Sequence, residues 1–63
     1  MYVVDRGDFV RTDALAGTVL EVIDGRKRRG WHPTLYFLVD VDRPWYGRGH
    51  KHIIRLDEIT RLR

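Results

Sequence analysis

The sequence predicts an all-β protein, a single domain over residues 1–63 that folds as a small five-stranded barrel. Three observations lead to this fold class. A chain of 63 residues can bury only one small core, so it is expected to form one domain. Its short apolar runs are rich in β-branched and aromatic residues and alternate with turn-forming residues. No stretch of ten or more residues shows the apolar spacing of an amphipathic helix.

The first two expected strands are separated by turn residues. A strand over residues 9–12 follows the turn pair Gly7-Asp8. A second strand over residues 17–23 ends at the turn dipeptide Asp24-Gly25. This strand and the third one are partly continuous in their apolar residues and do not alternate strictly, so we expect both to bend and to contribute to both sheets of a closed barrel. Gly17 suits a bend or a close approach of two backbones.

The later strands are expected over residues 34–41, 52–55 and 59–62. The third strand is dense in β-branched and aromatic residues and ends before Pro44, because proline cannot donate to a strand ladder. Between the last two strands, the Leu-Asp-Glu step at 56–58 predicts one 3₁₀ turn.

The expected core is apolar and draws on every strand. It comprises Val10, Val19, Val22, Val41, Ile54, Leu56 and Ile59, together with Leu38 or its neighbours Phe37 and Val39. The choice within the third strand stays open, because a single bulge reverses which side chains face inward. Since the chain has no cysteine, neither a disulfide nor a thiolate metal site can support this core.

Three short motifs resemble those of SH3-like barrels. They are Gly-Asp-x-Val-Arg at 7–11, Ala-Gly-Thr-Val at 16–19 and Ile-x-Arg-Leu-Asp-Glu-Ile at 53–59. The resemblance covers residues 5–62 and is greater to the KOW, Tudor-like and small prokaryotic SH3-like groups than to signalling SH3 domains. It implies a five-stranded barrel with a 3₁₀ turn before the last strand. It implies no single function, because such barrels bind nucleic acids, peptides or other subunits.

A weaker resemblance, carried by residues 7–11 and the spacing to Ile59, is to the type II plasmid dihydrofolate reductases. These are SH3-like barrels that build one active site at the centre of a tetramer. Their active-site run Val-Gln-Ile-Tyr corresponds here to Lys-His-Ile-Ile at 51–54, where only Ile53 agrees. The groups that would hold cofactor and substrate are missing, so we expect a protein that is not an enzyme, with no catalytic residues and no cofactor.

The positive charge is concentrated between the second and third strands. The net charge is +3, and Arg26, Lys27, Arg28 and Arg29 stand in a row just before Trp31. Adjacent cations repel one another, so such a run does not stabilise a fold by itself. Phosphate compensates it, since arginine binds phosphate through a bidentate fork, and tryptophan can stack on a base. The alternative is a solvated hairpin tip whose tryptophan folds back onto the barrel rim.

A second basic and aromatic loop is expected over residues 43–51. Trp45, Arg48 and Lys51 are its candidate contact residues, while the alternative for its aromatic rings is that they cover an edge of the core. If both loops project from the same side, they form one basic aromatic face. His50 and His52 share a strand face, but a His-x-His pair without a third nearby ligand does not indicate a metal site.

These features favour a non-enzymatic binding protein with two possible kinds of partner. The first prediction is binding of DNA or RNA through phosphate contacts and stacking by the two loops. The alternative is a protein-interaction module, such as a regulator or inhibitor, whose loops or open edges bind another protein or a second copy of the chain. The longest apolar run, residues 35–39, is too short to cross a bilayer, and no secretory signal precedes it, so the expected location is the cytoplasm.

Overall fold

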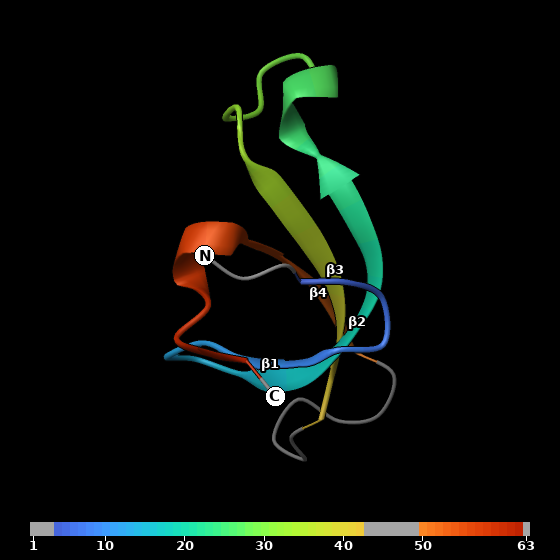
Figure 1. The fold of residues 1–63 in the computed structure, drawn as a ribbon, viewed down its shortest axis with the longest axis vertical. Helices are drawn as coiled ribbons and strands as arrows, with labels where there is room; N and C mark the ends of the chain where they lie inside the picture. Colours follow the sequence, from blue (N-terminus) through green and yellow to red (C-terminus); the bar gives the residue numbers. More distant parts are fainter. Residues whose placement is uncertain (1–3, 43–49, 63) are drawn as a thin grey trace.

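One antiparallel sheet of five strands makes up the fold (Figure 1). The computed structural model describes residues 4–42 and 50–62. The strands are β1 (Phe9–Arg11), β2 (Ala16–Asp24), β3 (Leu35–Val41), β4 (Lys51–Arg55) and β5 (Arg61–Leu62), and two 3₁₀ turns are η1 (Gly25–Lys27) and η3 (Leu56–Glu58). The all-β fold with five strands and a 3₁₀ turn before the last strand is therefore confirmed. The described residues contain no helix with the length and apolar character needed to cross a membrane.

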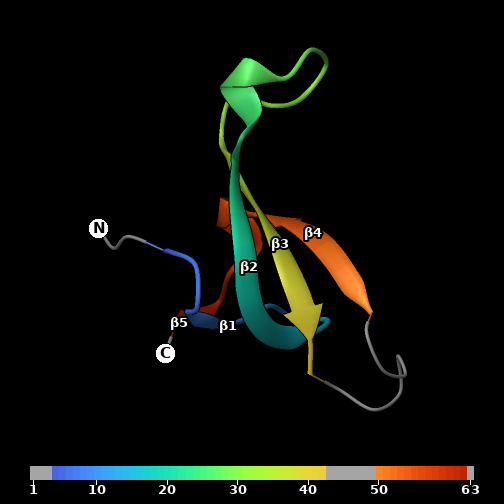
Figure 2. The ribbon, with the colours of Figure 1, turned by 90° about the vertical axis from the view of Figure 1, so that its right-hand side faces the viewer.

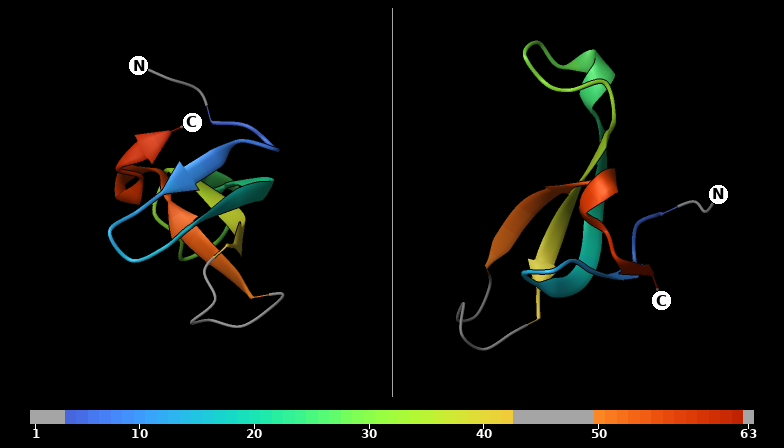
Figure 3. Two further views of the ribbon diagram at one scale, coloured as in Figure 1. Left: turned by 90° about the horizontal axis from the view of Figure 1, so that it is seen from below. Right: turned by 90° about the vertical axis from the view of Figure 1, so that its left-hand side faces the viewer.

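The strand order is β4-β3-β2-β1-β5, which makes β4 and β5 the two edges of the sheet. The long strand β2 pairs with β1 near its start and with β3 along most of its length. Its register with β3 shifts between Val19 and Glu21, as a bulge requires, and bulges bend and twist a strand. Figures 2 and 3 show this curve, which turns β1 and β5 across the direction of β3 and β4. The bend expected in the second strand is thus present.

Gly17 lies where β2 meets β3 too closely for any side chain. A Cβ atom at this position would clash with the carbonyl oxygen of Asp40 and would lie 2.7 Å from Cγ1 of Val39. The neighbouring contact is also tight, because the Asp42 N–H donates to the Ala16 carbonyl oxygen at 2.8 Å. The close backbone approach predicted for this glycine is confirmed.

The core is packed between the two halves of the curved sheet. Its buried members are Val4, Val10, Leu15, Val19, Phe37, Val39, Val41, Ile54 and Ile59, with Val22 and Leu56 partly buried against them. In β3 the alternation buries Phe37, Val39 and Val41 and leaves Leu38 half-exposed, which decides the choice that the sequence left open. Val22 and Leu56 therefore lie at the margin of the core rather than inside it.

Leu15 is a core residue that strand patterning does not predict, because it lies in the turn between β1 and β2. Thr12 ends β1 by accepting hydrogen bonds at its Oγ1 from the N–H groups of Ala14 and Leu15, each at 3.1 Å. This hydroxyl-based turn carries Leu15 back over the core, where it is 8% exposed. The turn also explains why β1 ends at Arg11, one residue earlier than expected.

Strand β5 is shorter than the stretch 59–62 that the sequence suggests. The Ile59 N–H donates to the Leu56 carbonyl oxygen at 3.2 Å and so completes η3 instead of joining a strand ladder. The ladder with β1 begins only afterwards, with Arg61 opposite Arg11.

Candidate functional site

The hairpin of β2 and β3 extends beyond the rest of the sheet and ends in a loop over residues 25–34 (Figures 1 and 2). Backbone hydrogen bonds order this loop. The Gly25 N–H donates to the Thr34 carbonyl oxygen at 2.8 Å, and the Arg28 N–H donates to the Gly25 carbonyl oxygen at 3.0 Å. Gly30 has φ of +84°, a backbone conformation that favours glycine, and it reverses the chain just before Trp31. The loop backbone is therefore a defined turn structure.

Arg26 is neutralised within the loop by Asp24. The Asp24 carboxylate accepts hydrogen bonds from the Arg26 backbone N–H (3.0 Å), from Nε (3.0 Å) and from Nη2 (2.9 Å). The side-chain hydrogen bond from Arg26, followed by the backbone one, lowers the pKa of Asp24 from 3.8 to about 2. The same pairing raises the pKa of Arg26. The guanidinium fork predicted to bind phosphate at this position is already occupied by a carboxylate.

Arg28 lies over Trp31, which in turn packs on β3. The Arg28 guanidinium carbon is 5.4 Å from the centre of the Trp31 ring, within the range of a cation–π interaction. The Trp31 and Tyr36 ring centres are 4.5 Å apart at an interplanar angle of 64°. The Tyr36 hydroxyl also accepts a hydrogen bond from the His32 N–H at 3.2 Å. Trp31 is half-buried, as expected if it folds back onto the protein. One face of its ring contacts the Arg28 guanidinium group.

Three cations of the loop remain without an acidic partner. Lys27, Arg28 and Arg29 are all exposed, and none of them forms an ion pair with another residue in the described part of the chain. We call this group the cationic tip. It consists of adjacent positive charges at the end of a projecting hairpin, which is an arrangement suited to binding an external anion.

The remaining predicted contact residues are not brought to the cationic tip. Lys51 pairs with Asp40 near the end of β3 that is remote from the loop. Leu35, at the near end of β3, and Asp40 are separated by about 17 Å of extended strand. The single face expected to join Lys51 with Arg28 and Arg29 therefore does not form. Trp45 and Arg48 lie outside the described residues.

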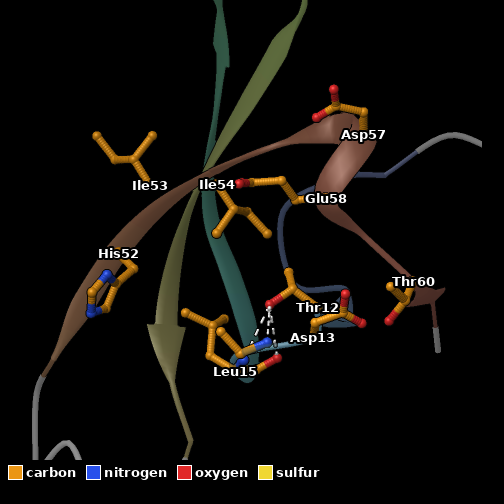
Figure 4. A pocket seen from close by; sticks show the side chains of 10 residues that line it. Thr12, Asp13, Leu15, His52, Ile53, Ile54, Asp57, Glu58 and Thr60 are labelled. Atoms are coloured by element: carbon orange, nitrogen blue, oxygen red, sulfur yellow. Dashed lines mark hydrogen bonds between the residues drawn. The ribbon is translucent and has the colours of Figure 1, made fainter.

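A groove of about 550 Å³ lies on another part of the molecule (Figure 4). It is lined by Thr12, Asp13, Ala14, Leu15, His52, Ile53, Ile54, Asp57, Glu58 and Thr60. Three of these residues are acidic and none is lysine or arginine. Asp57 forms an ion pair with Arg55, with 3.3 Å between Oδ1 of Asp57 and Nε of Arg55. The groove itself was missed, because residues 12–15 and β4 are far apart in sequence.

No group of three or more potential metal ligands occurs among residues 4–42 and 50–62. The ring centres of His50 and His52 lie 6.5 Å apart. Comparison with known proteins adds no assignment, since no protein-family model, no curated protein and no solved structure matches this chain.

Proposed function

We propose that this protein is a non-enzymatic nucleic-acid-binding module that contacts the phosphate backbone of DNA or RNA through the cationic tip. The observation that carries this proposal is the contrast within the loop. Arg26 has a carboxylate partner at 2.9 Å, whereas Lys27, Arg28 and Arg29 are exposed beside it with no acidic partner in the described residues. A phosphate backbone offers the closely spaced negative charges that would relieve their mutual repulsion.

Trp31 contributes to this function by holding Arg28. Its ring supports the guanidinium group at 5.4 Å and is itself fixed against Tyr36. A side chain ordered before binding loses less conformational entropy when it contacts a phosphate. Arg28 is therefore the cation of the tip that we expect to contribute most per contact.

Binding of this kind is non-specific and depends steeply on salt. Neutralising three phosphates on duplex DNA gives a slope of about −2.7 for the logarithm of the association constant against the logarithm of salt concentration. On single strands the same three contacts give a slope of about −2.1. For each kind of nucleic acid, the measured slope therefore gives the number of phosphates that the protein neutralises.

The test is a titration of fluorescently labelled duplex DNA and single-stranded RNA at several salt concentrations. A triple variant of the tip, Lys27→Gln, Arg28→Gln and Arg29→Gln, should weaken binding about 500-fold at 0.1 M salt and remove most of the salt dependence. The matched control, Arg6→Gln, Arg11→Gln and Arg61→Gln, removes the same charge from exposed positions elsewhere. An equal loss in both variants would show that binding follows net charge and would contradict the proposed site.

A further inference from the structure

Strand β4 forms one edge of the sheet, and its outer side can accept another strand. The Val41 N–H donates to the His50 carbonyl oxygen at 2.9 Å, which sets the phase of the ladder between β3 and β4. In an antiparallel pair, residues alternate between those bonded to the partner strand and those whose backbone groups face away. By this alternation, the backbone N–H and C=O groups of Ile53 face outward.

Arg55, two residues further along β4, has the same backbone orientation as Ile53. Its outward N–H donates to Oε1 of Glu58 at 2.8 Å, so the end of the edge is closed by a side chain. For Ile53, the residues that the structure describes provide no such partner on the outer side. Its side chain is also 50% exposed. The middle of β4 thus combines open backbone groups with exposed apolar surface.

The groove described above lies directly beside this edge. One wall is β4, the other is the turn over residues 12–15, and η3 closes one end (Figure 4). The side chain of Ile54 points across the groove toward Leu15, which gives it an apolar floor. A strand lying along β4 would therefore have apolar surface for its side chains as well as backbone groups to pair with.

The composition of such a strand depends on the charges that it meets, which are Lys51 and Arg55 at the two ends of β4 and the acidic side chains of the groove between β4 and the turn. Asp13, Asp57 and Glu58 line it, without any lysine or arginine. Of these three acids, Asp57 is paired with Arg55, whereas Asp13 and Glu58 form no ion pair within residues 4–42 and 50–62. A segment that carries positive charge is complementary to this groove. A nucleic acid, whose charge has the same sign as these carboxylates, is repelled from the groove.

We propose that an extended peptide segment of a partner protein, rich in lysine or arginine and interrupted by apolar residues, adds to β4 as a further strand and fills the groove. Backbone hydrogen bonds to Ile53 supply affinity, and Asp13 and Glu58 supply the preference for basic residues. The five residues of β4 span about 17 Å, so a matching segment has about five residues. A second copy pairing through its own β4 would bring two acidic grooves together, and like charges oppose that arrangement.

The direct test is an NMR titration of the ¹⁵N-labelled full chain with the capped peptide acetyl-Lys-Val-Lys-Val-Lys-amide. The amide resonances of Ile53, Asp13 and Glu58 should shift, while those of the cationic tip should not. Two further peptides carry N-methyl groups on alternate residues, offset from each other by one residue. The peptide that loses the N–H groups facing β4 should not bind, whereas the peptide that keeps those N–H groups should still bind. The acidic peptide acetyl-Glu-Val-Glu-Val-Glu-amide should produce no shifts at these residues.

Two double variants separate the charge of the groove from the overall charge. Asp13→Asn with Glu58→Gln should weaken binding of the basic peptide about threefold to tenfold. The control Asp5→Asn with Glu21→Gln changes the net charge equally at exposed positions outside the groove and should leave binding unchanged.

Several results would overturn the proposal. Absence of shifts at peptide concentrations on the order of 1 mM would exclude even weak binding. Equal binding of the two N-methylated peptides would exclude strand addition. A dimer in sedimentation that becomes tighter in the Asp13→Asn and Glu58→Gln variant, where the repulsion between two grooves is relieved, would assign this edge to a second copy of the chain instead.

Discussion

Replacing Asp24 by Asn is expected to strengthen nucleic-acid binding, because it releases Arg26 to act as a fourth cation beside the cationic tip. Asp24 now holds Arg26 through hydrogen bonds of 2.9 to 3.0 Å. The Arg26 side chain is already 69% exposed, so it can reach an external phosphate once the carboxylate is gone. Asparagine caps a helical turn as well as aspartate does, so the bond to the Arg26 backbone N–H is retained.

The magnitude follows from the number of phosphates neutralised. With three contacts the salt slope on duplex DNA is about −2.7, and with four it is about −3.6. At 0.1 M salt one further contact strengthens binding about eightfold, and the gain disappears as the salt concentration approaches 1 M. The variant therefore gains affinity and salt dependence together.

Fluorescence anisotropy with a labelled DNA duplex at several salt concentrations measures both quantities. Asp40→Asn is the matched control, because it removes an exposed carboxylate near the end of β3 that is remote from the loop. If both variants gain equally, the effect is one of net charge. If Asp24→Asn leaves the slope at its wild-type value, Arg26 does not join the tip and the proposed geometry is refuted.

Two further predictions concern the fold and its dependence on pH. Gly17→Ala should lower the free energy of unfolding by about 1–3 kcal/mol, because the new methyl group meets the backbone of Asp40. Urea denaturation measures this change, and a variant as stable as the wild type would contradict the close approach of the two strands. Because the pKa of Asp24 is lowered from 3.8 to about 2 in the folded chain, its pairing with Arg26 should stabilise the fold fully above pH 3.8 and progressively less as the pH falls toward 2. Acid denaturation of the wild type and of Asp24→Asn should therefore differ above this range and converge within it, whereas a constant difference down to the lowest pH would contradict the shifted pKa.

The third strand shows how far local patterning reaches. Its β-branched and aromatic residues indicate a strand, and the structure contains one. Whether Leu38 or its neighbours face the core was open, because the alternation depends on the pairing of β3 with β2. The register shift between Val19 and Glu21 sets that pairing, and a bulge of this kind is not visible in the residue pattern of either strand. Local sequence therefore predicts the strand but not which of its faces is buried.

Leu15 illustrates a second limit. It precedes an expected strand and belongs to no alternating pattern, yet it is among the buried core residues. Its burial depends on the hydroxyl of Thr12, which turns the backbone at that point. A single hydrogen-bonded turn has too weak a sequence pattern to reveal which core residue it will cover.

The sequence by itself determined the all-β class, the order and approximate positions of the five strands, the place of η3, the need for glycine at position 17 and the concentration of cations after Asp24. These properties are local, because they depend on residue type, spacing and turn chemistry. The structure adds that Asp24 pairs with Arg26, two residues away, because the 3₁₀ turn η1 brings their side chains together. Only the tertiary structure decided that Lys51 lies a strand length from the cationic tip and that an acidic groove opens beside β4. Those two features depend on distances between residues that are far apart in the chain, and no single stretch of the sequence determines them.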